Sequence, residues 1–260
     1  SQEDMHARGW YYCDFLLVTG DAYVDHPSFG TAVISRVLEA EGLRVAVLAQ
    51  PDWHDAEAFR AMGRPRLGVF IGAGNLDSMV AHYTAAKRRR SEDFYSPGKR
   101  TGCRPDRAAI VYCNRAREAF GPDVPIILGS LEASLRRFAH YDYWDDSVRR
   151  AILFDAPADL LVYGMGEAAT IEIAHRLKKK QSVHTMTDIP GTGYITRDPS
   201  VCTFDHITLP SFEDVRDDKR LYAEATRTEY AEHDPVRGRA LCQKHGRRYL
   251  LQNPPDMPLS

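Results

Sequence analysis

Residues 14–50 constrain the fold of this chain more than any other stretch, because they carry the pattern of a β-α-β unit. An apolar run at 15–18 breaks into a polar loop at 20–30, an amphipathic segment follows, and a second β-branched run begins at Val45. Two parallel strands joined by a helix show this order of elements. In open α/β sheets, ligands bind at the carboxyl ends of the strands. The polar loop is therefore predicted to lie at a ligand-binding edge. Its candidate binding residues are Asp21, Asp25, His26 and Ser28. The alternative is loop architecture, in which the two aspartates accept hydrogen bonds from turn amides and Ser28 caps the following helix.

Strand-like runs recur after this unit, and each ends in glycine. They lie at 66–71, 124–128 and 159–163. Helical periodicity is found at 31–41, 75–86, 108–120 and 166–177. This alternation predicts an α/β fold with a Rossmann-like, doubly wound, five-stranded parallel sheet over residues 1–182. Residues 183–260 are predicted to form a mainly helical C-terminal appendage and linker. Within it we expect one helix at 211–228, a second around 235–245 and a strand-like run at 248–251. The glycine turns after the strands add the candidate binding residues Gly74, Asn75, Gly129, Gly164, Gly166 and Glu167.

Residues 87–107 interrupt the alternation with a polar insertion of eight basic and three acidic residues, here called the basic insertion. Clustered Lys and Arg neutralise phosphates, and Phe94 and Tyr95 offer rings for base stacking, so RNA is a candidate partner. A charge run of this kind is also typical of a plain solvated surface. The sequence leaves both interpretations open.

Residues 129–150 gather charged and aromatic side chains directly after the run at 124–128. Arginines are suited to anchoring carboxylates and phosphates, and flat aromatic rings stack on planar ligands. The alternative is a structural cluster in which the arginines pair with the aspartates at 142, 145 and 146. The candidate binding residues of this segment are Glu132, Arg136, Arg137, His140 and Tyr141.

The composition sets the class of protein but names no activity. A formal charge of -2 gives no overall bias toward nucleic acid, and no apolar run reaches the length of a membrane helix. The five cysteines lack the spacing of a metal site or a disulfide framework, which favours free thiols. We expect a cytoplasmic protein without a membrane partner, and the sequence shows no catalytic or metal-ligating residue set.

Several long strings resemble the N-terminal region of YgiQ-type radical SAM proteins. They are GDAYVDHPSFG, AQPDW, GNLDSMV, CRPDR, EASLRRFAHYDYW and the closing RYLLQNPPDMPLS. The resemblance runs from Cys13 to Pro258. Ser130 departs from it, because the family pattern more often has glycine there.

The resemblance implies a domain similar to cobalamin-binding domains, placed before a radical SAM barrel that holds a [4Fe-4S] cluster and S-adenosylmethionine. This sequence contains no C-x-x-x-C-x-x-C motif, so we expect it to be inactive alone, with its own barrel as its partner. Cobalamin is a candidate cofactor, although Val24 breaks the D-x-H-x-x-G pattern and makes His26 a poor axial ligand. The expected role is cofactor binding or control of substrate access. The alternatives are docking of RNA or a small-molecule substrate, and a purely structural cap.

Overall fold

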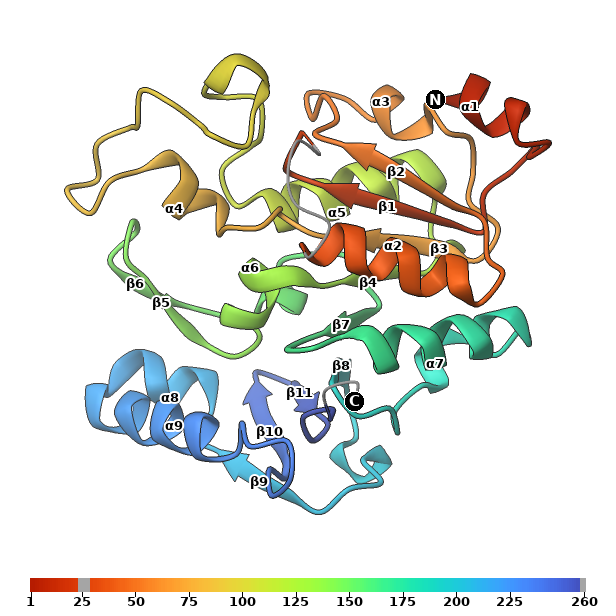
Figure 1. Cartoon of the computed structure of the whole chain (residues 1–260). Helices are drawn as coiled ribbons and strands as arrows, with labels where there is room; N and C mark the ends of the chain where they lie inside the picture. Colours follow the sequence, from red (N-terminus) through yellow and green to blue (C-terminus); the bar gives the residue numbers. More distant parts are fainter. Residues whose placement is uncertain (23–28, 258–260) are drawn as a thin grey trace. The chain divides into compact units, whose positions relative to one another are not determined.

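The computed structural model describes residues 1–22 and 29–257, which Figure 1 colours along the sequence. They divide into two compact units. Unit 1 comprises Ser1–Ala133 and Ala156–Ala158, and unit 2 comprises Ser134–Asp155 and Asp159–Ser260. This division assigns residues 134–155 to the second unit, whereas the sequence predicted one boundary after residue 182.

Unit 1 contains a parallel sheet in the strand order β2-β1-β3-β4. Its strands are β1 (Phe15–Thr19), β2 (Val45–Ala49), β3 (Gly68–Ile71) and β4 (Ile126–Leu128). The chain runs from β1 outward to β2 and then crosses back to β3. The carboxyl ends of β1 and β3 therefore form the topological switch point, where ligands bind in folds of this class.

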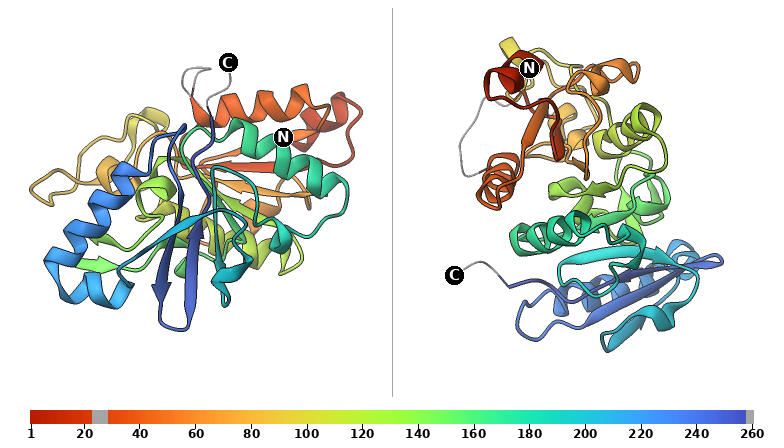
Figure 2. Two further views of the ribbon diagram at one scale, coloured as in Figure 1. Left: turned by 90° about the horizontal axis from the view of Figure 1, so that it is seen from below. Right: turned by 90° about the vertical axis from the view of Figure 1, so that its right-hand side faces the viewer.

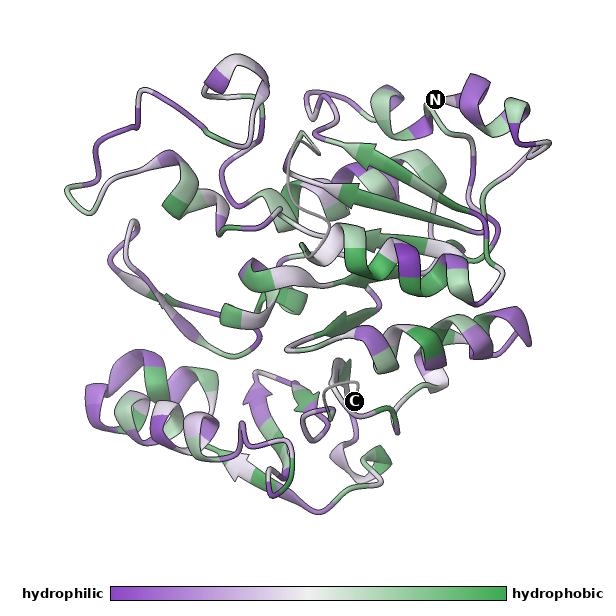
Figure 3. Cartoon of the chain, in the orientation of Figure 1, coloured by the Kyte–Doolittle hydropathy of each residue, from purple (hydrophilic) through white to green (hydrophobic). Residues whose placement is uncertain are grey.

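Helices cover both faces of the unit 1 strands, which is why the strands are nearly all apolar. In Figure 2, right, α2 and α5 lie on opposite sides of the strands. Figure 3 shows the same strands as the hydrophobic centre of the unit. The rings of Phe15 and Phe70 are 5.1 Å apart within this core. The helices of unit 1 are α1 (Gln2–Ala7), α2 (Gly30–Ala40), α3 (Glu57–Arg60), α4 (Ser78–His82), α5 (Ala108–Phe120) and the start of α6 (Ser130–Leu135).

Unit 2 contains a mixed sheet in the strand order β7-β8-β11-β10-β9 and a separate hairpin. Only β9 and β10 pair in parallel, and the other neighbours are antiparallel. The sheet strands are β7 (Leu160–Val162), β8 (Thr192–Thr196), β9 (His206–Leu209), β10 (Ala240–His245) and β11 (Arg248–Gln252). The hairpin strands are β5 (His140–Asp142) and β6 (Ser147–Arg149), and the helices are α7 (Glu167–Lys178), α8 (Phe212–Asp217) and α9 (Lys219–Ala231).

The α/β class is confirmed, and all five predicted strands form, as β1, β2, β3, β4 and β7. The strand count is higher than five, because residues 183–260 add β8 to β11. The expectation of a mainly helical appendage was therefore wrong in part. A helix was expected around 235–245, yet β10 occupies most of that stretch. Its residues pair with strands on both sides and are buried, so tertiary pairing overrides the local helical pattern.

The single helix expected at 211–228 is two helices, α8 and α9. The break lies at Asp218, whose extended backbone ends α8. Its side chain accepts a hydrogen bond from the amide of Arg220 at 2.7 Å and so caps α9. None of the helices in the described part of the chain is long and apolar enough to cross a membrane.

Candidate functional site

The loops that leave β1 and β3 touch at the switch point of unit 1. A Cβ on Gly20 would lie 2.1 Å from the carbonyl oxygen of Ala73, so the two backbones are already in contact. Gly74 has φ +108, and a Cβ there would lie 2.2 Å from Oδ1 of Asp21. The Asp21 carboxylate also accepts the amide hydrogen of Asn75 at 2.7 Å. Three of the predicted binding residues, Asp21, Gly74 and Asn75, therefore lie together here, and they contact one another.

A buried arginine from the basic insertion joins this group. Arg104 donates from Nε and Nη2 to the two carboxylate oxygens of Asp93, at 3.0 and 2.9 Å. Its Nη1 donates to Oδ1 of Asp21 at 3.0 Å and to the carbonyl oxygen of Ala73 at 3.3 Å. The Arg104 side chain is 0% exposed and the Asp93 side chain 1%. One buried cation is therefore shared by two carboxylates, here called the Arg104 triad.

The two carboxylates of the Arg104 triad are not equivalent. Burial raises the pKa of Asp21 above its usual value, and the charge of Arg104 does not overcome this effect. Burial also opposes ionisation of Asp93, but the hydrogen bonds and charge of Arg104 and the amide of Tyr95 hold the pKa of Asp93 below its usual value. Asp93 is therefore the principal ion-pair partner of Arg104. Ionisation of Asp21, which would add a second buried negative charge, is disfavoured.

Neutral hydrogen bonds attach the basic insertion to the same edge. The amide of Ala22 donates to the carbonyl oxygen of Tyr95 at 2.9 Å. The side-chain amide of Gln50, directly after β2, donates to Gly20 O at 2.9 Å and to Ser96 Oγ at 2.8 Å. Ser96 Oγ donates in turn to Asp93 Oδ2 at 3.0 Å. The insertion therefore lies against the carboxyl ends of β1 and β2, a placement that sequence reasoning missed.

Glu132 supports this edge from within. Its carboxylate is fully buried and accepts the amide hydrogens of Ser78, at 2.8 Å, and Ala109, at 3.1 Å. These amides open α4 and α5, so Glu132 satisfies the first turns of two helices. Ser130 adopts φ +72, a conformation that favours glycine, and its hydroxyl accepts the amide hydrogen of Ala73 at 3.2 Å. Gly129 before it donates its amide to the carbonyl oxygen of Ile71 at 2.8 Å.

The predicted residues that follow α6 belong to unit 2. Arg136 is buried, and its carbonyl oxygen accepts the amide hydrogen of Ile152 at 2.8 Å. His140 lies with Nδ1 3.0 Å from the carbonyl oxygen of Phe138, and burial lowers the pKa of His140 to about 4. Tyr141 is exposed and its hydroxyl donates to the carboxylate of Asp146.

Two aspartates of this segment pair with one of its arginines, Arg149. Arg149 lies 3.8 Å from Asp142 and 3.1 Å from Asp145. A third carboxylate, that of Asp155, lies 3.4 Å from the same guanidinium. This cluster closes the β5–β6 hairpin, so part of the segment is structural, as the alternative interpretation held.

The turn after β7 contains three predicted residues, and Tyr163 just before it contacts a fourth, Arg137. Gly164 has φ +68, and Gly166 caps α7, which begins at Glu167. The guanidinium of Arg137 lies 5.3 Å from the ring of Tyr163, which directly precedes this turn. The Tyr163 hydroxyl donates to the carbonyl oxygen of Asn253 at 2.7 Å, which fixes the ring. Unit 2 therefore places Arg137 beside the glycine turn.

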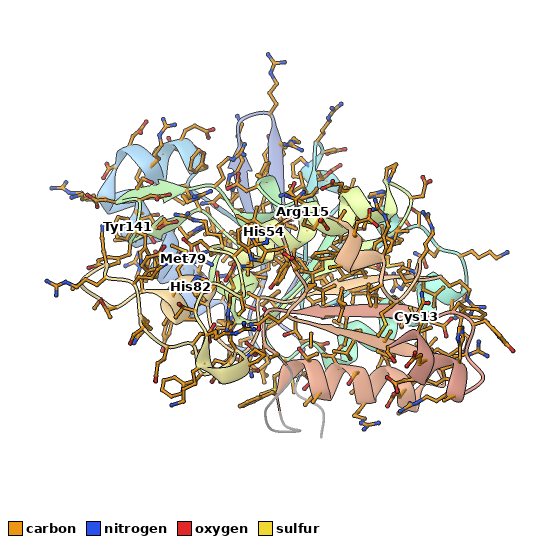
Figure 4. All side chains as sticks on the ribbon, turned by 90° about the horizontal axis from the view of Figure 1, so that it is seen from above. Cys13, His54, Met79, His82, Arg115 and Tyr141 are labelled. Carbon is orange, nitrogen blue, oxygen red and sulfur yellow. The ribbon has the colours of Figure 1, made fainter. Side chains whose placement is uncertain are left out.

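The remaining predicted residues, Asp25, His26 and Ser28, lie outside the described residues. Among the residues that are described, no group of three or more His, Cys, Asp or Glu side chains could hold a metal ion. His82, which is labelled in Figure 4, lies on α4 and contacts a single carboxylate within the described ranges. Its Nδ1 is 2.6 Å from Asp106 Oδ1.

The described end of β1 and β3 does not fit a corrinoid. A ligand between these strands needs the volume that the Asp21 carboxylate and the Arg104 guanidinium occupy. Displacing Arg104 would leave two buried carboxylates without their cation, which is strongly unfavourable. No cobalamin site is therefore assigned to this edge.

Comparison with known proteins gives a consistent family for the whole chain. The family model described as "Radical SAM N-terminal" matches residues 1–260. A UPF0313 protein of Clostridium botulinum is 55% identical over 260 residues, covering 100% of this chain and 40% of that protein. A UPF0313 protein of Clostridium perfringens is 54% identical over 259 residues, covering 100% of this chain and 39% of that protein. The chain thus spans about 40% of the length of these relatives.

Solved structures give a weaker match. The radical S-adenosylmethionine methyltransferase TsrM from Kitasatospora setae is 22% identical, with 69% of this chain and 28% of that chain covered and a TM-score of 0.42. One of its structures contains cobalamin and a [4Fe-4S] cluster. A similarity at this level carries no argument about the site. The family model and the relatives of high identity agree, and the chain belongs to the radical SAM N-terminal family.

Proposed function

We propose that this chain is an accessory region of a larger radical SAM iron–sulfur enzyme, in which it guides an anionic substrate to the reacting centre. Its family and its share of longer relatives support the first part. The [4Fe-4S] cluster and S-adenosylmethionine would be held by another part of the enzyme, which would carry out the radical step. This region would then contribute binding and orientation.

The observation that carries the second part is the attachment of the basic insertion. Residues 87–92 and 97–102 are exposed, but Asp93, Ser96 and Arg104 are buried and bonded at the switch point. Hydrogen bonds and ion pairs therefore anchor the insertion to unit 1, and its exposed residues form a defined surface. Six of its basic residues are exposed, against one exposed carboxylate, that of Glu92. The exposed cations are Lys87, Arg88, Arg89, Arg90, Lys99 and Arg100.

Single-stranded RNA is the anionic substrate that this surface suits. Phe94 is 69% exposed, and the ammonium group of Lys99 lies 4.8 Å from its ring centre. An exposed ring beside cations is the combination that binds bases by stacking and phosphates by charge. Glu92 takes up part of the Lys99 charge at 3.6 Å, whereas Arg88 and Arg90 have no carboxylate partner among the described residues.

The test is salt-dependent binding of a single-stranded RNA of mixed sequence to the whole 260-residue chain. Replacing Arg88, Arg89 and Arg90 with alanine should weaken binding at low salt at least about tenfold. The slope of log K against log salt should fall by about 2, because about 0.7 is lost for each phosphate contact on a single strand. Binding can be followed by the fluorescence anisotropy of a labelled RNA.

The matched control is the exposed run Lys178, Lys179 and Lys180 at the end of α7. Replacing these three lysines removes the same charge and should leave RNA binding unchanged. Equal losses in both variants would mean that only net charge matters and would overturn the docking role. A change in the visible spectrum of hydroxocobalamin on mixing with the chain would instead favour a cofactor-binding module.

A further inference from the structure

Unit 2 contains an arginine, Arg137, that forms no ion pair with another described residue. Arg137 donates from Nε to the side-chain oxygen of Gln252 at 2.6 Å and from Nη1 to the carbonyl oxygen of Ser134 at 2.6 Å. Both acceptors are neutral. Neither an ion pair nor any hydrogen bond from Nη2 joins Arg137 to the described residues. This guanidinium is thus held in place while its charge and one of its amino groups remain available.

Aromatic rings surround this guanidinium. It lies 5.5 Å from the ring centre of Phe138 and 5.3 Å from that of Tyr163. The ring of His233 follows, 6.2 Å from the Tyr163 ring. Burial lowers the pKa of Arg137, which means that its charged form is less stable here than in water. A cation in such surroundings is stabilised when an anion desolvates with it.

Glu229 of α9 is the nearest acid, and it does not supply that anion. It interacts with Arg137 electrostatically without forming an ion pair. Burial raises the pKa of Glu229 to about 7, against the effect of the Arg137 charge. Near neutral pH the carboxyl group is therefore protonated in about half of the molecules.

We propose that Arg137 is the anchor of a binding site for a small monocarboxylate. The Nη1–Nη2 edge of a guanidinium matches the two oxygens of a carboxylate. The rings of Phe138 and Tyr163, each 2% exposed, hold the guanidinium in place. A phosphate dianion is disfavoured, because the negative charge of Glu229 acts on the same place. This site is independent of the basic insertion, so either proposal can fail without the other.

The probe is benzoate, with benzyl alcohol as the neutral analogue and phenyl phosphate as the dianion. Saturation-transfer NMR with the whole chain should show benzoate binding, and binding of the other two should be at least about tenfold weaker. Arg137→Gln should reduce benzoate binding about tenfold or more, the loss typical of a charge-assisted pair. Arg216→Gln is the matched control, because Arg216 is exposed and pairs with the neighbouring Asp217. It should bind benzoate as the parent chain does.

A pH series separates this site from a merely structural arginine. Ionised Glu229 competes with the ligand for Arg137, so benzoate should bind more tightly as the pH falls from 8 to 6. Glu229→Gln should bind tightly across this range and lose the dependence. The other ionisable groups that face the cluster are Tyr163, His233 and Asp256. Protonation of His233 or Asp256 would also strengthen benzoate binding as the pH falls. Loss of the pH dependence in Glu229→Gln would therefore assign it to Glu229.

Benzoate binding that survives in a folded Arg137→Gln chain, or that phenyl phosphate matches, would overturn the proposal. If Arg137→Gln does not fold, Arg137→Lys keeps the charge but not the two-point geometry. That variant should still lose most of the affinity. A pH dependence unchanged in Glu229→Gln would likewise contradict the site.

Discussion

At the scale of single residues, the Arg104 triad decides what the switch point can hold. One guanidinium faces two carboxylates, and their pKa values move in opposite directions. Asp93 makes two bonds to Arg104, whereas Asp21 makes one and also receives the amide of Asn75. Asp93 is therefore the main partner of the Arg104 charge, and ionisation of Asp21 is the less favourable of the two.

This asymmetry makes a prediction about stability. Asp93→Asn should lower the free energy of unfolding by about 2–4 kcal/mol, because it leaves a buried cation without its main partner. Asp21→Asn should cost less than about 1 kcal/mol, because the amide oxygen still accepts hydrogen bonds and one of two like charges is gone. Urea unfolding followed by circular dichroism measures both. Equal costs, or the reverse order, would contradict the assignment of Asp93 as the principal partner.

At the scale of elements, β10 shows how a strand can form where the sequence favours a helix. His245 at its end is 5% exposed and stacks between Phe154, at 4.4 Å, and Phe212, at 5.4 Å. Its Nε2 lies 3.1 Å from the side-chain oxygen of Gln243, which also accepts the amide hydrogen of Ala139 at 2.9 Å. Burial lowers the pKa of His245 from 6.5 to about 4.

This burial predicts acid sensitivity. The unfolded chain takes up a proton on His245 near pH 6.5, and the folded chain does so only near pH 4, so stability should fall as the pH falls between these values. The loss from this residue is about 3 kcal/mol at most. His245→Phe keeps the stack and leaves Gln243 bonded to Ala139, so it should flatten the dependence. Urea midpoints at several pH values provide the measurement.

The control for this experiment is the exposed His184, 71% exposed at its side chain. His184→Gln should retain the parent dependence on pH. His140 has a pKa lowered to about 4 by burial as well, so part of the dependence should remain in His245→Phe. A parent chain whose stability does not change between pH 6.5 and 4 would show that both histidines become protonated in the folded state.

At the scale of the whole molecule, the chain spans about 40% of the length of its relatives. Under the proposed function, another part of the longer protein holds the [4Fe-4S] cluster. The five cysteines are free, and three of them are buried. Cys13 lies just before β1 (Figure 4), and burial raises its pKa and that of Cys242 to about 11. A buried thiol of this kind is a poor cluster ligand, because iron binds the thiolate.

We therefore predict that the [4Fe-4S] cluster of the proposed longer enzyme assembles without these cysteines. Replacing Cys13, Cys113 and Cys242 with alanine and Cys103 and Cys202 with serine, one at a time, should leave the iron content unchanged. Iron analysis and the visible absorption of anaerobically purified protein measure this. Loss of the cluster in any folded variant would assign a ligand to this region and contradict the proposal.

The sequence predicted those parts of the molecule that local pattern determines. The β-α-β unit, α5 and α7 form where periodicity placed them, because the apolar face of a helix is set by residues three or four positions apart. The position of Arg104 could not be predicted, because its partner Asp21 lies 83 residues away in the sequence. The role of Glu132 was missed for the same reason. In the sequence, Glu132 resembles any surface acid. Only the folded structure brings the amides at the starts of α4 and α5 to its carboxylate.

The buried Arg104 also limits how this domain can change during evolution. A variant that lost the basic insertion would still have Asp21 beside Gly74, now without a counter-charge. A variant that lost Asp21 alone would keep Arg104 and Asp93 at this edge. Opening the space between β1 and β3 therefore requires coupled substitutions on distant segments, whereas the exposed cations of the insertion can be exchanged one by one.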